Sequence, residues 1–180
     1  RSPSRGLGDV YKRQFLWRVH KEVPAKGQIA IFNRSHYEDI IAVRVKKIFP
    51  DPVWKRRYKH VLDFESMLAE EGTVIIKLFL NISKAEQKKR LESRLQDPDK
   101  LWKFCMDDLD DRNRWDEFQT AYQDLIEKTS TPEAPWYIIP ADRKWYRNLV
   151  VARLMVEKLR HLQLSLPTPN FDPASIIIPD

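Results

Sequence analysis

Three short, almost wholly apolar runs separated by segments with helical spacing constrain this chain more than any other feature of its sequence. QIAIF at 28–32, TVIIKLFLNI at 73–82 and WYII at 136–139 have the length and apolar content of buried strands. The segments between them repeat apolar residues three and four positions apart, as amphipathic helices do. Strands that alternate with helices favour an α/β fold built on a parallel sheet.

Capping and stop signals predict where the helices begin and end. After a short helix over 15–20, Ser35 with Glu38 forms a capping box, and the Pro-Asp-Pro at 50–52 ends the helix that it opens. A second helix is expected from about residue 55 to residue 71, where Gly72 follows as a stop.

Three further helices are expected in the second half of the chain. Ser83 with Glu86 repeats the capping box and opens a basic helix that runs to Leu95. The other two present apolar faces over 115–125 and 145–159, and Asp142 is placed to cap the last of them.

Size and composition fit one soluble globular domain. The chain has 180 residues, of which 42% are hydrophobic and 32% charged, enough apolar material for a core. No window approaches the roughly 18 consecutive apolar residues of a membrane span, so no membrane partner is expected. A single cysteine, Cys105, excludes a disulfide framework, and with no signal-peptide pattern a cytoplasmic location is expected.

The net charge of +6 is unevenly distributed. Residues 44–59 hold seven cations and one anion, 84–94 hold five cations and two anions, and 107–117 hold six acids and two arginines. Clustered cations attract polyanions such as nucleic acid, nucleotide phosphates and inorganic polyphosphate. The alternative is that each run is a solvated helix face.

Polar segments follow each expected strand. They are residues 33–39, 81–94 and 141–148. Because sites in parallel sheets lie at the carboxyl ends of the strands, these three segments are expected to meet at one edge of the sheet.

Three long stretches of the sequence carry a family resemblance. GQIAIFNRSHYEDIIAVRV, FESMLAEEGTVIIKLFLNISKAEQKKRLESRLQDPDKLWKF and TSTPEAPWYIIPADRKWYRNLVVARLMVE resemble the polyphosphate kinase 2 family, from about Phe15 to the C-terminus. The form FNRSHYED resembles the branch that accepts both AMP and ADP, whereas other branches carry Asp at the position of Asn33.

The resemblance implies a three-layer α/β/α fold of the P-loop kinase type with a helical lid over about 84–112. It also implies transfer of phosphoryl groups between inorganic polyphosphate and AMP or ADP with Mg²⁺, in an enzyme that is a homo-oligomer when complete. The family's glycine-rich loop ending in Lys lies N-terminal to the matched region, and the sequence contains no GxxxxGK[ST]. The chain is therefore expected to be an inactive C-terminal portion that lacks the first strand and the phosphate loop.

This interpretation predicts three segments. Residues 1–14 are expected to be a disordered tail outside the family, and 15–164 an incomplete P-loop kinase-like domain. Residues 165–180 are expected to be a Pro-rich extended tail.

Catalytic roles are expected for Arg34, Asn33 and Arg94. Phosphoryl transfer depends on positioning and on positive charge at the phosphate oxygens, and Arg34 follows a strand where its guanidinium can reach a phosphate bidentately. The alternative for Arg34 is an ion pair with a helix acid. Asn33 stands where a Walker-B-like carboxylate would lie, so Asp39 is expected to be an indirect metal ligand, whereas the capping box accounts for Glu38.

Substrate-binding roles are expected along the lid, the basic run and the last turn. Arg90 and Arg94 lie four residues apart and share a helix face that can close over phosphates, although a solvated basic helix is the alternative. Lys77 interrupts an apolar strand, and it is either a residue at the rim of the site or a phosphate contact. Asp142 either faces the nucleotide or caps the last helix. The full substrate-binding set is Arg90, Lys103, Arg56, Arg57, Lys77, Asp142, Lys144 and Asn148.

Two other functions compete with this interpretation. An ATP-dependent nucleoside monophosphate kinase would share the fold and the lid. A non-catalytic basic domain that binds nucleic acid is the second alternative, but the sequence contains no recognisable nucleic-acid motif, so no nucleic-acid partner is expected.

Overall fold

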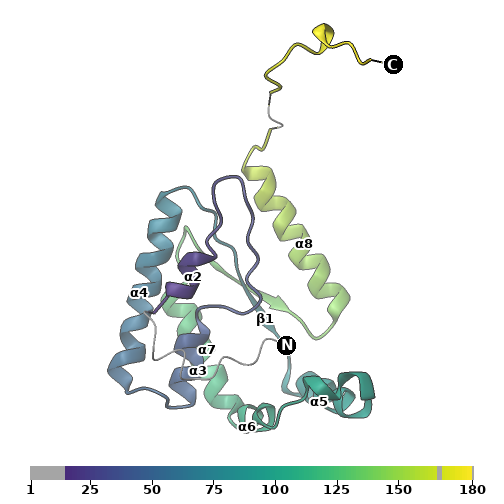
Figure 1. Cartoon of the computed structure of the whole chain (residues 1–180). Helices are drawn as coiled ribbons and strands as arrows, with labels where there is room; N and C mark the ends of the chain where they lie inside the picture. The colour runs from purple at the N-terminus through teal and green to yellow at the C-terminus, as the bar shows by residue number, and fades with distance from the viewer. Residues whose placement is uncertain (1–14, 166–167, 180) are drawn as a thin grey trace. The chain divides into compact units, whose positions relative to one another are not determined.

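The computed structural model describes residues 15–165 and 168–179 (Figure 1). These residues divide into two compact units. Among the described residues, the first unit comprises 15–79 and 84–138, and the second comprises 80–83 and 139–179. The tail expected over 1–14 lies outside the described residues.

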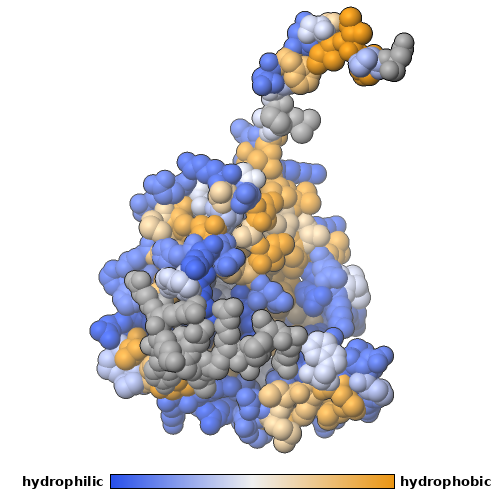
Figure 2. All heavy atoms as spheres, in the orientation of Figure 1, coloured by the Kyte–Doolittle hydropathy of each residue, from blue (hydrophilic) through white to orange (hydrophobic). Residues whose placement is uncertain are grey.

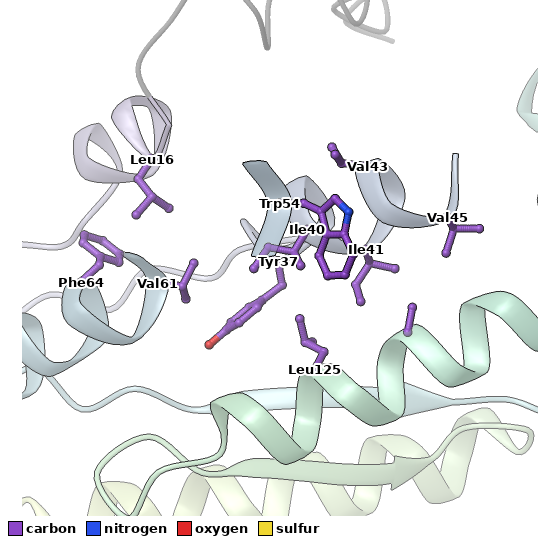
Figure 3. Close-up of a cluster of buried hydrophobic side chains, with 11 residues drawn as sticks. Leu16, Tyr37, Ile40, Ile41, Val43, Val45, Trp54, Val61, Phe64 and Leu125 are labelled. Atoms are coloured by element: carbon purple, nitrogen blue, oxygen red, sulfur yellow. The ribbon is translucent and has the colours of Figure 1, made fainter. Parts of the chain in front are cut away.

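A helical core forms the centre of the first unit. Helix α3 (Glu38–Val45) packs against both α4 (Asp51–Glu70) and α7 (Trp115–Thr129), and α2 (Trp17–Lys21) precedes them in the chain. Fully buried apolar side chains from all three packed helices meet there, among them Ile40, Val61 and Leu125 (Figure 3). Burial of each such side chain stabilises the fold by about 1.5–3 kcal/mol.

The lid region expected over 84–112 consists of three short helical elements in the same unit. These are α5 (Lys84–Gln96), the 3₁₀ helix η1 (Pro98–Lys103) and α6 (Asp107–Asn113), and α5 packs against η1. Leu91 is the one residue of α5 that is buried among the described residues. This segment over 84–112, named the lid below after its expected role, therefore has little apolar core of its own.

Two strands pair in a small parallel sheet, which confirms the α/β class. They are β1 (Lys77–Asn81) and β2 (Trp136–Pro140). The strand expected over 73–82 is shorter in the structure, where β1 begins only at Lys77.

The second unit contains α8 (Lys144–His161) and the 3₁₀ turn η2 (Pro173–Ser175). No residue of α8 is buried, and Trp145 is 63% exposed. Apolar groups of this unit therefore reach the molecular surface (Figure 2). None of the described helices is both long and apolar enough to cross a lipid bilayer.

The predicted strand over 28–32 is wrong. The segment has no regular structure, and Ile29 and Ile31 are 68% and 87% exposed. A strand needs a hydrogen-bonded neighbour, and in the described part of the chain only β1 and β2 pair with each other.

Two predicted helix ends also differ from the structure. Helix α4 begins at Asp51 because Pro52 occupies its first turn, where a missing N–H costs nothing. Helix α3 begins after Tyr37, which makes no side-chain cap; instead the Ser35 hydroxyl accepts a hydrogen bond from the Tyr37 N–H at 3.3 Å. The expected Ser35–Glu38 capping box is therefore absent.

Candidate functional site

The turn between residues 33 and 39 presents the first group of predicted site residues. Asn33 and Arg34 are exposed, and Arg34 has a φ of +85°, in a region that few residues other than glycine adopt. Its side chain is 77% exposed, and its Nη1 lies 3.7 Å from Oε2 of Glu38. An ion pair this exposed contributes less than about 1 kcal/mol to stability. A more highly charged anion can therefore displace the Glu38 carboxylate from Arg34.

The carboxyl groups beside Arg34 differ in their environment. Burial raises the pKa of Glu38, and Arg34 opposes that rise. Oδ2 of Asp39 lies 3.8 Å from Nη2 of Arg18, while the Asp39 carbonyl accepts a hydrogen bond from Arg57 at 2.6 Å. Asp39 is thus fixed through its backbone.

Directly beneath this turn lies a buried polar cluster that the sequence analysis missed. The Tyr37 hydroxyl donates to Oε1 of Glu65 at 2.7 Å. Nζ of Lys77 donates to Oε2 of Glu65 at 2.7 Å, to the Thr129 carbonyl at 2.6 Å and to the Tyr37 hydroxyl at 3.2 Å. The ammonium has three protons and three protein acceptors, so Lys77 lies in the interior and is fully hydrogen-bonded there.

Burial and charge act in opposite directions on this cluster. Burial alone would raise the pKa of Glu65, but contacts from His36, Lys77 and Tyr37 outweigh it and hold that pKa below its ordinary value. Burial lowers the pKa of Lys77 and the Glu65 carboxylate opposes the shift. Burial together with Glu65 raises the pKa of Tyr37. Two sequence signals could have revealed the pair. A charged residue stands beside apolar residues in both cases, Lys77 inside an apolar run and Glu65 beside Phe64.

The two arginines predicted to bind polyphosphate in α4 have different surroundings. Arg57 is 8% exposed and its guanidinium lies 4.6 Å from the ring centroid of Phe15 and 5.0 Å from that of Phe49. Arg56 is exposed and donates to the Pro52 carbonyl at 3.2 Å. Arg57 therefore anchors the turn, whereas Arg56 faces solvent.

The predicted cations of the lid differ in exposure: Arg90 and Arg94 are half-buried, whereas Lys103 is exposed. Nε of Arg90 donates to Glu86 at 2.8 Å, and Nη1 of Arg94 lies 3.5 Å from Oδ2 of Asp108. Both side chains of the Arg94–Asp108 pair are 38% exposed. Lys103 in η1 places its ammonium 5.0 Å from the Trp102 ring centroid.

The remaining predicted residues lie in the second unit. Oδ1 of Asp142 accepts a hydrogen bond from the Ser83 N–H at 2.8 Å, and α8 begins after Arg143 without a side-chain cap. The alternative that Asp142 caps α8 is therefore wrong. Lys144 is exposed in the first turn of α8, and the Asn148 side chain accepts hydrogen bonds from Arg147.

The structure thus brings the predicted residues together in separate groups. The turn over 33–39 collects Asn33, Arg34 and Asp39, and the lid collects Arg90, Arg94 and Lys103. Because residues 28–32 form no strand, the expectation that Arg34 and the segment over 33–39 follow a strand is wrong. That the segments over 33–39, 81–94 and 141–148 meet at one site stays a prediction.

The residues predicted to lie near a metal ion are Asn33 and Asp39, both in the turn over 33–39. Among the described residues, no three His, Cys, Asp or Glu side chains lie close enough to hold an ion. Asp39 faces Arg18, and Asn33 supplies no charge. Mg²⁺ generally binds through one or two carboxylates together with substrate phosphates, so at most Asn33 and Asp39 would contribute from this turn.

Comparison with known proteins identifies the family. The sequence matches the family model for polyphosphate kinase 2 over residues 9–166. The chain belongs to the polyphosphate kinase 2 family. The family model begins six residues before the Phe15 expected from the resemblance.

Named relatives and solved structures agree with this assignment. The AMP/ADP-polyphosphate phosphotransferase of Meiothermus ruber is 54% identical over 92% of this chain and 62% of that protein. The ADP-polyphosphate phosphotransferase of Rhodopseudomonas palustris is 37% identical over 87% of this chain and 58% of that protein. The crystal structure of polyphosphate kinase 2 from Arthrobacter aurescens superimposes with a TM-score of 0.89 at 45% identity, covering 97% of this chain and 61% of that chain.

This similarity assigns the chain to the P-loop kinase-like fold of the family. The chain spans about three-fifths of the length of these relatives.

Proposed function

We propose that this chain is part of a phosphotransferase that moves phosphoryl groups between inorganic polyphosphate and AMP or ADP. The single observation that carries the proposal is its 54% identity, over 92% of the chain, with a relative named for that reaction. The exposed cations of the turn over 33–39 and of the lid support it, because the reaction needs positive charge rather than covalent chemistry from the protein.

Arg34 is proposed to contact the phosphoryl group that is transferred. Its guanidinium is exposed and its contact with Glu38 is weak, whereas a terminal phosphate offers more charge and bidentate geometry. Positive charge placed where phosphate oxygens accumulate charge stabilises the transition state. The phosphoryl group passes directly from donor to acceptor, without a covalent enzyme intermediate.

The lid is proposed to close over the same phosphates. Arg90 and Arg94 lie on one face of α5, and Lys103 follows in η1. Closure of the lid would exclude water from the phosphates and bring its cations to them after the substrate has bound. Exposed cations of the basic run, Arg56 among them, are proposed to bind the polyphosphate chain.

Mg²⁺ is proposed to arrive bound to substrate phosphates, because the described residues hold no cluster of ligands. When bound, the ion would neutralise phosphate charge. Cations of the chain would neutralise the phosphate charge that the ion leaves.

Activity requires a glycine-rich phosphate loop, which the sequence does not contain. We therefore expect the 180-residue chain alone to be inactive, and appreciable turnover by it would refute that expectation. The test of function uses a protein in which this chain continues from such a loop, supplied with AMP and polyphosphate but no ATP. Formation of ADP, measured by chromatography, supports the proposal, and its absence refutes it.

Two controls separate the competing functions. ADP formation from AMP that requires ATP would identify a nucleoside monophosphate kinase. Displacement of bound polyphosphate by labelled RNA at lower concentration would favour a nucleic-acid-binding domain.

A further inference from the structure

The buried cluster beneath the turn is built from four separate elements of the first unit. Tyr37 directly precedes α3, Glu65 lies in α4, Lys77 begins β1 and the Thr129 carbonyl ends α7. The four residues are between 0% and 6% exposed. A single set of hydrogen bonds therefore joins the end of the turn to three other parts of the core.

Stability alone is a poor explanation for this cluster. Removing an ammonium and a carboxylate from water costs several kcal/mol for each ion, and apolar side chains of similar volume often stabilise a core equally well or better. What the charges add is a demanding geometry, since every proton of Lys77 and the hydroxyl proton of Tyr37 has one acceptor. Such a network specifies one arrangement of the elements that it joins.

That arrangement determines where Arg34 lies. Tyr37 follows Arg34 by three residues, and the Tyr37 N–H is bonded to Ser35 within the same turn. On the other side, Arg57 holds the Asp39 carbonyl at 2.6 Å. The backbone of the turn is thus tied at both ends, and Arg34 retains a positive φ between them with its side chain in solvent.

We infer that Tyr37, Glu65 and Lys77 are positioning residues that act through Arg34. The network holds the turn so that the guanidinium is already directed outward before an anion binds. The inference rests on the proposed function, in which Arg34 binds a phosphate. An anchored arginine loses less conformational entropy when it binds, which improves affinity.

A double-mutant cycle on the 180-residue chain tests this inference through the dissociation constant for inorganic polyphosphate. Arg34→Ala is expected to weaken binding about tenfold, as loss of a charge-assisted hydrogen bond does. Tyr37→Phe, which removes only the hydroxyl, is expected to weaken binding about threefold in the parent and not at all in the Arg34→Ala background. Amide hydrogen exchange should accelerate over 33–39 while protection of α4 persists.

Tyr58→Phe is the matched control. The Tyr58 hydroxyl is buried in the same core and makes no hydrogen bond within the described part of the chain. Its removal is expected to leave polyphosphate binding and exchange over 33–39 unchanged. Glu65→Gln serves as a second variant if Tyr37→Phe unfolds, and the same coupling with Arg34 is expected.

The outcomes separate the inference from the proposed function. If Arg34→Ala weakens binding but the Tyr37 effect is equally large in both backgrounds, the network is merely structural and the inference is wrong. If Arg34→Ala leaves polyphosphate binding unchanged, the proposed role of Arg34 fails and the inference fails with it. Equal exchange over 33–39 in Tyr37→Phe and the parent also contradicts the inference.

Discussion

The helical core and the lid both carry cations, but they use them differently. In the core, the Lys77 side chain is 5% exposed and lies 2.7 Å from the Glu65 carboxylate, itself 3% exposed. In the lid, the Arg94 side chain is 38% exposed and lies 3.5 Å from Asp108. The core cation has three acceptors inside the protein, whereas the lid cation lies farther from its carboxylate and is partly open to solvent.

Burial and partner distance determine which cations are available to bind a ligand. A buried ammonium with three acceptors would have to break a compensated network before binding a phosphate. An exposed guanidinium with a weak partner gives up little. Charge counted along the sequence does not separate these two groups, but burial and partner distance do.

The largest effect is expected when the core pair loses one partner. Glu65→Ala leaves the Lys77 ammonium buried without its carboxylate, so the free energy of unfolding should fall by about 3–5 kcal/mol. Urea denaturation of the 180-residue chain measures the change. Glu92→Ala is the control, because Glu92 pairs at 3.7 Å with Lys88 on the surface of α5 and should alter stability by less than about 0.5 kcal/mol. A loss below about 1 kcal/mol for Glu65→Ala would show that the buried pair is not structural.

Arg34→Ala should affect catalysis rather than folding. In the enzyme proposed above, the substitution should cost about 2.7–4 kcal/mol of transition-state stabilisation, measured as a fall in kcat, by analogy with the loss of one oxyanion donor. Lys128→Ala removes an exposed cation of α7 that lies 3.6 Å from Asp124 and should leave kcat unchanged. A rate within about threefold of the parent for Arg34→Ala would refute its catalytic role.

The core pair should also make stability depend on pH. Because the pKa of Glu65 is held below its ordinary value of 4.5, the unfolded chain binds the proton more readily than the folded chain. Glu65 therefore contributes to the free energy of unfolding above pH 4.5, and this contribution is lost as the pH falls through the lower pKa that Glu65 has in the folded chain. Urea denaturation at pH values on both sides of 4.5 should show this loss in the parent. A Glu65→Gln variant with the same acid profile would contradict the assignment.

The smallest effect is expected at the lid. Asp108→Asn removes the partner of Arg94, so polyphosphate should bind slightly more tightly, by less than about 1 kcal/mol. Asp110→Asn removes the same charge two residues further along α6, on a different side of the helix. Titration of both variants with polyphosphate distinguishes them. Equal tightening by both would mean that net charge, rather than release of Arg94, is responsible.

Local patterns in the sequence predicted most of the elements but not the partners of the charged residues. Helical spacing located α7 and α8, and Gly72, with a φ of +88°, ends α4 as expected. The apolar run over 28–32 misled the strand prediction because strand pairing depends on a neighbour that periodicity does not reveal.

The site could be predicted only in part for the same reason. Arg34 is exposed and Arg94 is half-buried, so both guanidinium groups reach solvent, as a phosphate-binding role requires. Arg57 and Lys77 were grouped with them by charge, but long-range contacts with Asp39 and Glu65 bury both. Contacts between residues so distant in sequence are set by packing and leave no local signature.

The salt dependence of polyphosphate binding, compared between the parent chain and Arg94→Ala, shows whether the exposed cations bind a phosphate polymer. Accessible cations predict clear binding at low ionic strength that weakens steeply as salt is added. Arg94→Ala should bind more weakly at low salt and lose less affinity on salt addition. Binding that is absent, or that is unaffected by salt in both proteins, would contradict the claim that the exposed cations of this chain bind a phosphate polymer.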